Sequence, residues 1–296
     1  MEGRIEDWIK AGRIAAEALA YGKSLIKPGA RLLDVSDKVE ARIFELGGKL
    51  AFPAQISCDH IAAHYCAEPN DTIIFDKQVV SLDVGVHVNG CIGDTALTVD
   101  LSGEHKDLIK ASEEALKAAI ALVRPGVTLN EIGKAVQEVI GSRGFSPVRN
   151  LSGHGLAPYQ IHTKPSIPNF ASGETYRLQE GQVIAIEPFA TTGKGLIQEG
   201  GNATIFSVAA KRPSRNPFSR TLLDDLDVYE GLPFTTRWLY RKHPPVKVAF
   251  ALRELVQTRS LVAYPPLVEV AHGLVSQAEH TVLVGEEPRV LTSVEE

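Results

Sequence analysis

Two runs of β-forming residues, separated by an Asn-Gly pair at 89–90, constrain the fold of this chain more than any other feature. The first run covers residues 80–88 and the second covers residues 91–99. Asn-Gly between two such runs is typical of a hairpin closed by a type I′ turn. We therefore predict two long antiparallel strands in which Val88 pairs with Cys91.

This register determines where two acidic side chains fall. Asp83 lies opposite Ala96, so Asp94, two residues from Ala96, shares the same face of the hairpin. Diagonal neighbours of this kind are about 7–8 Å apart at Cα, within reach of each other's side chains. Two carboxylates that face one point of an apolar sheet lose hydration and repel each other, so they need a cation or a shared proton. The hairpin indicates a metal site, and the alternative is a pair of exposed strand carboxylates.

An internal repeat relates the two halves of the chain. A Pro-Gly pair at 28–29 is followed by apolar residues at helical spacing and then by Gly47. The same pattern follows a Pro-Gly pair at 125–126 and ends at Gly144, so that each matched position is offset by 97 residues. Glycine after such a pattern commonly ends a helix. We predict one helix at this point in each half.

The repeat continues into residues that carry chemistry. An offset of 98 residues relates His64 to His162, and an offset of 104 relates Asp83 to Glu187. Loop insertions in a duplicated unit would leave offsets that grow in small steps. Each half therefore offers a histidine and then a carboxylate at the end of an apolar strand, and a pseudo-twofold domain would bring both pairs to a common centre.

Two further segments complete a set of candidate ligands. His154 stands among small residues in Ser-Gly-His-Gly, where a backbone can approach a ligand closely. Glu279 precedes a β-type run, as the carboxylates at 83 and 187 do. Four hard oxygen donors and one imidazole suit a pair of borderline-to-hard divalent ions. The candidate ligands are Asp83, Asp94, His154, Glu187 and Glu279.

Composition limits the other classes of function. The formal net charge of −5 gives no reason to expect nucleic acid or an anionic membrane as a partner. The three cysteines have neither CxxC spacing nor an even count, which predicts reduced thiols in a cytoplasm. The first residues predict an amphipathic helix rather than a signal peptide, and no run approaches the roughly 20 apolar residues of a membrane span.

Twelve short segments, in order along nearly the whole chain, carry a family likeness: Ala-Phe52-Pro, Ala-Ala-His64-Tyr, Leu-Asp83-Val-Gly, Gly-Asp94-Thr-Ala, Asn-Leu-Ser-Gly-His154, Ile-His162, Ser-Ile-Pro-Asn169, Ile-Glu187-Pro-Phe, Thr-Gly-Lys-Gly195, Arg-Trp238-Leu, Tyr264-Pro-Pro-Leu and Gln-x-Glu279-His-Thr. They resemble the segments of methionine aminopeptidases of the type 2 subfamily, in the shorter archaeal form. The resemblance implies the pita-bread α/β (α+β) fold, whose internal pseudo-twofold agrees with the repeat. It also implies a catalytic domain of residues 1–203 and 265–296, with the type 2 helical insertion at 204–264.

The resemblance assigns a role to each candidate ligand. All five positions bind a dinuclear metal centre in the family. Those that match Asp94 and Glu279 bridge both ions, the one that matches Asp83 serves one ion, and those that match His154 and Glu187 serve the other. Cobalt, manganese, iron and zinc all suit this donor set, so the identity of the two ions stays open.

The resemblance further implies removal of the initiator methionine when the second residue is small, by attack of a hydroxide held between the two ions. His64 and His162 are expected to contact the scissile peptide, and Glu187 to accept a proton. Phe52, Ile161 and Tyr264 are expected to complete the substrate pocket. One departure is Ala278, where relatives usually carry Phe before the bridging glutamate, which leaves the width of the pocket open.

The expected partners follow from this activity. We expect nascent polypeptides as substrates, proximity to the ribosome, a monomer in the cytoplasm, and neither a membrane nor a specific nucleic acid as a partner. An Xaa-Pro peptidase of the same fold would share the metal ligands and is a first alternative. A relative that binds RNA or protein without catalysis is a second alternative, and it would have lost ligands that this chain keeps.

Overall fold

The Asn-Gly turn closes the hairpin that the sequence predicts. The structure, a computed structural model, describes residues 2–293. Strands β4 (Val79–Val88) and β5 (Cys91–Asp100) pair along their full length, with Val88 opposite Cys91 and Asp83 opposite Ala96. Asn89 and Gly90 have φ angles of 50° and 87°, the two positive values that a type I′ turn requires. The predicted register is confirmed.

Seven α-helices and one short 3₁₀-helix are found in residues 2–293, with these bounds: α1 (Glu2–Leu25), α2 (Leu32–Glu45), α3 (Lys106–Leu122), α4 (Leu129–Ser142), α5 (Pro217–Asp225), η1 (Leu226–Tyr229), α6 (Thr236–Tyr240) and α7 (Pro245–Gln257). Besides β4 and β5, the same residues form sixteen strands: β1 (Lys49–Leu50), β2 (Gln55–Cys58), β3 (Ile61–Ala63), β6 (Ser146–Pro147), β7 (Ser152–Ala157), β8 (Gln160–Pro168), β9 (Val183–Ile186), β10 (Phe189–Thr191), β11 (Ile197–Glu199), β12 (Ile205–Val208), β13 (Phe234–Thr235), β14 (Leu261–Tyr264), β15 (Leu267–Glu269), β16 (Val275–Gln277), β17 (His280–Leu283) and β18 (Arg289–Val290). None of the helices described is long and apolar enough to cross a membrane.

The internal repeat is visible as two matched halves. Helices α2 and α4 begin and end 97 residues apart and have equal length. Gly47 and Gly144, which follow them, share a φ angle of 81°, a conformation that glycine adopts without strain. The predicted pair of helices is therefore confirmed.

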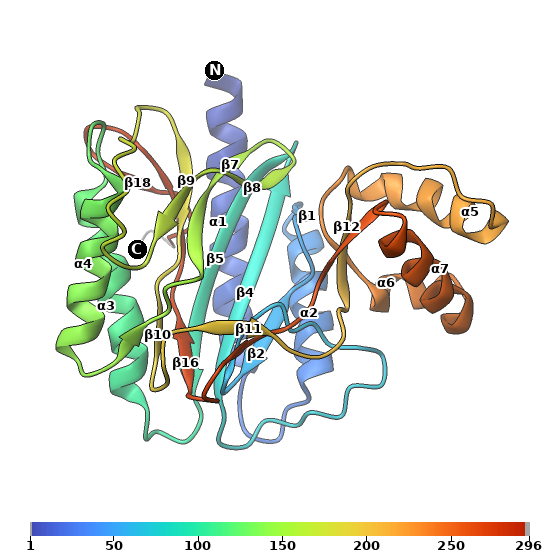
Figure 1. The fold of residues 1–296 in the computed structure, drawn as a ribbon, viewed down its shortest axis with the longest axis horizontal. Helices are drawn as coiled ribbons and strands as arrows, with labels where there is room; N and C mark the ends of the chain where they lie inside the picture. The colour runs from blue at the N-terminus through green and yellow to red at the C-terminus, as the bar shows by residue number, and fades with distance from the viewer. Residues whose placement is uncertain (1, 294–296) are drawn as a thin grey trace.

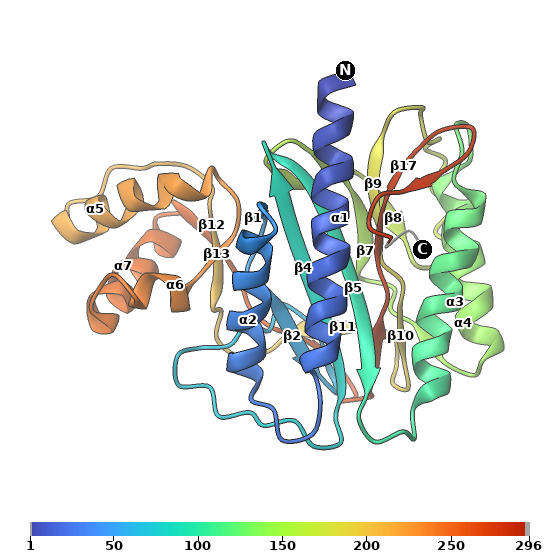
Figure 2. The same ribbon diagram turned by 180° about the vertical axis from the view of Figure 1, so that it is seen from behind.

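Each half has its own apolar core between helices and sheet. In the first half, α1 and α2 pack on β4, and in the second, α3 and α4 pack beside β10, β16 and β8. The four helices lie along one side of the strands, as Figure 2 shows from behind. Strands β7 and β9 of the second half lie on the opposite side of the molecule from helix α1 (Figure 1).

The antiparallel strands form five small sheets. Strand β4 pairs with β1, β2 and β5, and a five-stranded sheet has the order β18-β17-β9-β7-β8. Two three-stranded sheets, in the orders β16-β10-β6 and β11-β15-β3, lie next to these. The C-terminal strands β16 and β17 contact β5, so the end of the described chain closes the seam between the two halves.

Residues 204–264 form a separate layer at one side of the molecule (Figure 1). Helices α5, α6 and α7 surround a core of their own that includes Leu222, Phe234 and Leu252. The sequence predicts a helical segment here, and the structure adds a three-stranded sheet, β13-β12-β14, at its entry and exit. Reading this layer as the type 2 insertion stays a prediction.

Candidate metal centre and substrate cavity

The long hairpin fixes Asp83 and Asp94 at the centre of the molecule. The side chain of Asp94 is buried, with 2% of the residue exposed. Its backbone is held by Thr281, whose hydroxyl accepts from the Asp94 N–H and donates to the Asp94 carbonyl oxygen, both at 2.8 Å. A burial this complete excludes the alternative of two exposed strand carboxylates.

Glu279 reaches the same point from the C-terminal end of the chain. It lies between β16 and β17 and forms an isolated antiparallel bridge with Ala96. The Glu279 N–H donates to the Ala96 carbonyl oxygen at 3.0 Å, and the Glu279 carbonyl oxygen accepts from the Thr95 hydroxyl at 2.8 Å. This bridge places the buried Glu279 carboxylate next to the Asp94 strand.

His154 and Glu187 come from neighbouring strands of the second half. His154 in β7 pairs with Ala185 of β9, and Glu187 directly follows β9. The His154 Nε2 atom lies 3.6 Å from Glu187 Oε1 and 3.8 Å from Asp94 Oδ2. Glycine at 153 permits this close packing, because a Cβ there would lie 2.3 Å from the Ala185 carbonyl oxygen. The two halves therefore meet at one cluster.

The chemistry of this cluster fits a divalent metal. Asp94, His154 and Glu279 each offer one ligand atom, and these atoms lie within 4.8 Å of one another. The Oδ1 atoms of Asp83 and Asp94 are buried without a hydrogen-bond partner. No lysine or arginine of residues 2–293 lines the cavity described below. The cluster thus concentrates negative charge that protein groups leave uncompensated, as expected for a metal site.

Protonation of the cluster follows from burial and mutual repulsion. Burial raises the pKa of Asp83 to about 7. Burial, together with repulsion from the neighbouring carboxylates, raises the pKa values of Asp94, Glu187 and Glu279 well above the ordinary range. Burial lowers the pKa of His154 to about 3, so its imidazole is neutral and able to act as a ligand at neutral pH. Bound cations would favour the ionised carboxylates.

All ten residues that the sequence predicts for the site line one cavity of about 240 Å³. Five of them are the candidate metal ligands. The remaining five are the two histidines and three apolar or aromatic residues: His64, His162, Phe52, Ile161 and Tyr264. The structure therefore brings the whole predicted set together, and it includes further lining residues that sequence reasoning missed.

The two histidines related by the repeat stand in different surroundings. His64 follows β3 in the left-handed region, with a φ angle of 64°, and its N–H donates to Gln55 Oε1 at 2.7 Å. Burial, and the nearby ring of His162, lower the pKa of His64 to about 4. The ring of His162, on β8, packs edge-on against His154 with centroids 4.5 Å apart. Both imidazoles are neutral near pH 7, because burial also lowers the pKa of His162.

The apolar side of the cavity combines residues from both domains of the prediction. Phe52 packs against Gly85, where a Cβ would lie 2.1 Å from its ring. The Tyr264 ring meets the His64 ring edge-on at 5.7 Å, and its hydroxyl shares a 2.9 Å hydrogen bond with Ser207.

Sequence reasoning missed Gln55, Asn150, Ile205 and Pro233, which also line the cavity. Asn150 had an available signal, because it opens the segment Asn-Leu-Ser-Gly-His154. Gln55 lies opposite Asp83 in the pairing of β2 with β4, which only the structure shows. Ala278, the departure from the family pattern, is not among the lining residues and packs instead in the core of α3 and α4.

A buried acidic cluster with one imidazole, at the meeting point of two matched halves, is typical of metal-dependent hydrolases. The sequence model of metallopeptidase family M24 matches residues 6–286, so the chain belongs to this family. Its fold is the pita-bread fold that the sequence predicts.

Within the family, this chain is similar to methionine aminopeptidases. It is 46% identical over 283 residues to the methionine aminopeptidase of Methanocaldococcus jannaschii, which is 95% of each chain. A solved methionine aminopeptidase from Thermotoga maritima matches 99% of this chain and 98% of its own, with a TM-score of 0.72 and 25% identity. A thermophilic Arx1 has a TM-score of 0.86 over 98% of this chain and 91% of its own, and at 15% identity it shows the fold alone. These findings do not favour the Xaa-Pro peptidase or the non-catalytic alternative.

Proposed function

We propose that this protein removes the N-terminal methionine of polypeptides whose second residue is small. The observation that carries the proposal is the convergence of Asp94, His154 and Glu279, whose ligand atoms lie within 4.8 Å of one another in the lining of a cavity that can receive a peptide end. Relatives at 46% identity over nearly the whole chain support the same activity.

The donor set supports two divalent ions in the cavity. In this assignment Asp94 and Glu279 would be shared by the two ions, Asp83 would hold one of them, and His154 and Glu187 would hold the other. Manganese, iron, cobalt and zinc all accept carboxylate and imidazole ligands, so the donors do not select among them. When bound, such ions polarise a carbonyl and lower the pKa of water toward neutrality.

The chain's own residues supply the proton transfers and the charge stabilisation. Glu187 lines the cavity beside His154 and would accept the proton that the attacking water releases. His64 and His162 face the cavity as neutral imidazoles. Each can donate an N–H to the peptide oxygen or leaving nitrogen as charge develops, a contribution that typically amounts to about 3–4 kcal/mol per donor.

The apolar wall binds the methionine side chain. Phe52, Ile161 and Tyr264 offer an aromatic and aliphatic surface of the kind that an unbranched thioether fills. The second residue of the substrate has to pass between the segments that carry His64 and His162, so a small side chain fits best. We further assign the activity to a cytoplasmic monomer that acts on nascent chains near the ribosome, without a membrane or a specific nucleic acid as partner.

Peptide cleavage tests this proposal directly. The metal-free protein is loaded in turn with manganese, iron, cobalt and zinc, and each form is assayed on Met-Ala-Ser, Met-Lys-Ser and Ala-Pro-Ser. We expect release of methionine from Met-Ala-Ser with at least one metal and little release from Met-Lys-Ser. Equal cleavage of the two methionyl peptides would refute the size rule, and cleavage of Ala-Pro-Ser alone would restore the Xaa-Pro alternative.

A further inference from the structure

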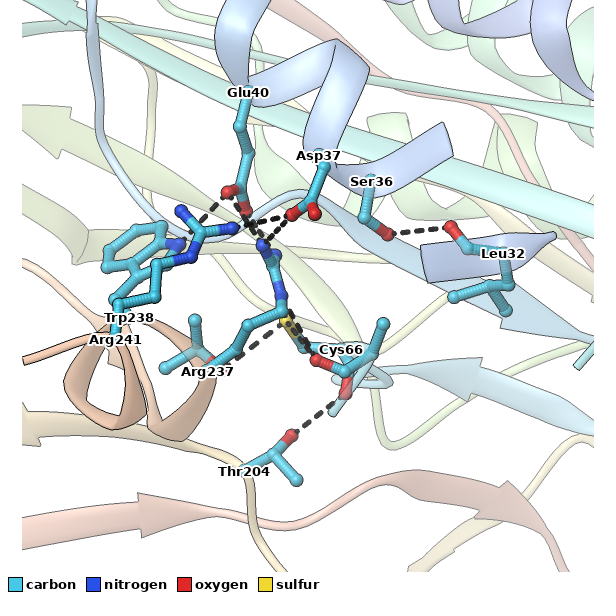
Figure 3. A network of polar contacts seen from close by, with 11 residues as sticks. Leu32, Ser36, Asp37, Glu40, Cys66, Thr204, Arg237, Trp238 and Arg241 are labelled. Carbon is cyan, nitrogen blue, oxygen red and sulfur yellow. Dashed lines mark hydrogen bonds and ion pairs between the residues drawn. The ribbon is translucent and has the colours of Figure 1, made fainter. Parts of the chain in front are cut away.

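Arg237, in helix α6, is an arginine with only 2% of its surface exposed, and it lies outside the metal centre. Its guanidinium pairs with two carboxylates of helix α2 (Figure 3). The Nη2 atom donates to Glu40 Oε1 at 2.6 Å and Nη1 donates to Glu40 Oε2 at 3.1 Å, while Nη1 also donates to Asp37. The two-pronged contact with Glu40 fixes orientation as well as distance.

The neighbours of this pair complete its charge balance. Trp238 Nε1 donates to Glu40 Oε2 at 2.9 Å, and Arg241 Nη2 donates to Asp37 at 2.8 Å. Two carboxylates thus face two guanidinium groups. Glu40 is almost fully buried, so its charge depends on Arg237 for compensation.

Arg237 also binds the segment that follows His64. Its Nε donates to the carbonyl oxygen of Ala67 at 3.2 Å, three residues beyond His64. The Thr204 hydroxyl donates to the adjacent carbonyl of Cys66 at 3.3 Å. The Cys66 thiol also donates to the Thr235 hydroxyl at 3.5 Å. Segment 65–67 is therefore held from the side of residues 204–264 through both its backbone and the Cys66 side chain.

Residues 204–264 also contribute Ile205 and Tyr264 to the lining of the cavity. Ile205 of β12 pairs with Thr235 on one side and with Tyr264 on the other. The chain passes from Thr235 directly into α6, so Arg237 stands two residues from this sheet. The Thr236 N–H, donating to the Thr204 carbonyl at 3.0 Å, fixes the start of α6 to β12. Ile205 and Tyr264 both line the cavity that contains the candidate metal ligands.

We propose that Arg237 is a positioning residue that sets the width of the substrate pocket. It holds the wall of Ile205 and Tyr264 at a fixed distance from helix α2 and from the segment of His64. Rotation of α6 would move Tyr264 and the backbone after His64 together. Helix α6 continues from the β13-β12-β14 sheet that contains Tyr264, and its Arg237 binds the Ala67 carbonyl oxygen. The inference rests on the proposed function for its substrate, since the pocket is taken to receive the methionine side chain.

The experiment compares the variants Arg237→Met, Arg237→Lys and Arg237→Met/Glu40→Met with Arg143→Met. Arg143 pairs with Glu114 between α3 and α4, away from the cavity lining, and serves as the matched control. Each manganese-loaded protein is assayed on Met-Ala-Ser and on ethionyl-Ala-Ser, whose side chain is one methylene longer. The ratio of the two kcat/KM values does not depend on the fraction of folded protein.

We expect Arg237→Met to raise KM for Met-Ala-Ser and to lower the preference for methionine over ethionine by about tenfold, the scale of one methylene in a fitted pocket. Arg237→Lys should recover part of this preference, because lysine restores the positive charge but cannot make the bidentate contact with Glu40. The double variant removes both buried charges, so it should fold stably yet keep the relaxed preference. Arg143→Met should match the wild type.

Amide hydrogen exchange gives a readout that does not need activity. Residues 62–68 and 204–208 should exchange faster in Arg237→Met and in the double variant, and at the wild-type rate in Arg143→Met. Unchanged exchange, or a double variant with the wild-type preference, would overturn the positioning role and leave Arg237 as a stabilising group only. A wild-type protein that releases no methionine would instead refute the proposed function, while the exchange result would still test the contact.

Discussion

The two halves of the repeat contribute to the metal cluster in different ways. In the first half, Asp83 and Asp94 lie inside a continuous hairpin of two ten-residue strands. In the second half, Glu187 lies between β9 and β10, where Pro188 has no N–H to continue the ladder, and Glu279 lies in a similar gap between β16 and β17. Helices α2 and α4 have the same length in the two halves, whereas the strands that carry the candidate ligands differ.

The histidines related by the repeat show the same divergence. His64 leaves its strand in a left-handed conformation and meets Tyr264 from residues 204–264. His162 stays within β8 and meets His154, a candidate ligand. Equivalent positions in a duplicated fold can thus face the same cavity while their surroundings assign them different neighbours.

The largest effect is expected from Asp94→Asn, which removes a carboxylate of the continuous hairpin. Loss of a group that we propose is shared by both ions should lower kcat/KM more than about a hundredfold. It should also shrink the stabilisation by manganese, which for the wild type is about 2.7 kcal/mol at a hundredfold excess over Kd. Melting curves with chelator and with manganese measure this, with the exposed Glu104→Gln as control. If manganese raised the Tm of both proteins equally, Asp94 would not be shared between the ions.

The next effect separates the histidines by role. His64→Ala and His162→Ala should each lower kcat by about a hundredfold, because a donor to the developing charge is lost, and both should still bind manganese. His154→Ala should weaken manganese binding. Kinetics and metal titration of the three proteins test this division. Loss of metal affinity in His64→Ala would show that the equivalent positions do not share a role.

A smaller effect concerns pH in the metal-free protein. Burial raises the pKa of Asp83 to about 7, against about 4 in an unfolded chain. The folded state then retains a proton that the unfolded state has lost, so Asp83 costs stability increasingly from about pH 4 to pH 7.

With chelator present, Asp83→Asn should therefore melt above the wild type at pH 7.5, by a few degrees, and the gap should close toward pH 5. Manganese should remove the advantage of the variant, because the metal binds the ionised carboxylate. A gap that widened on acidification would contradict the raised pKa.

The smallest effect on catalysis is expected from Ala278→Phe, next to Glu279 in the second half. Ala278 packs in the core of α3 and α4 and does not line the cavity. The phenyl ring of the variant should cost about 1–3 kcal/mol of stability through overpacking, while KM for Met-Ala-Ser changes little. Ala271→Phe, at an exposed position, is the control. A lower Tm with unchanged KM supports this placement, and an altered KM contradicts it.

Prediction from sequence works best where a local rule fixes geometry. The Asn-Gly turn determines the pairing of β4 with β5, and therefore the positions of Asp83 and Asp94. The repeat offsets identify His162 and Glu187 from their counterparts in the first half. These residues could be found without coordinates, because period and register are properties of the chain itself.

The remaining features depend on contacts between distant segments. Ile205 and Pro233 line the cavity only because residues 204–264 fold back on the core, and no local pattern sets that docking. The ion pair of Arg237 with Glu40 joins residues nearly two hundred positions apart. A charged side chain in a short amphipathic helix predicts exposure, so its burial could not be anticipated.

The backbone bridge between Ala96 and Glu279 also orders the events of biosynthesis. Translation delivers Asp83, Asp94, His154 and Glu187 before Glu279, and a contact between such distant segments forms late in folding. Until β17 docks, the cluster lacks one carboxylate and the two halves lack the strand that joins them. The set of candidate ligands is therefore complete only after the C-terminal segment has been synthesised and has docked on β5.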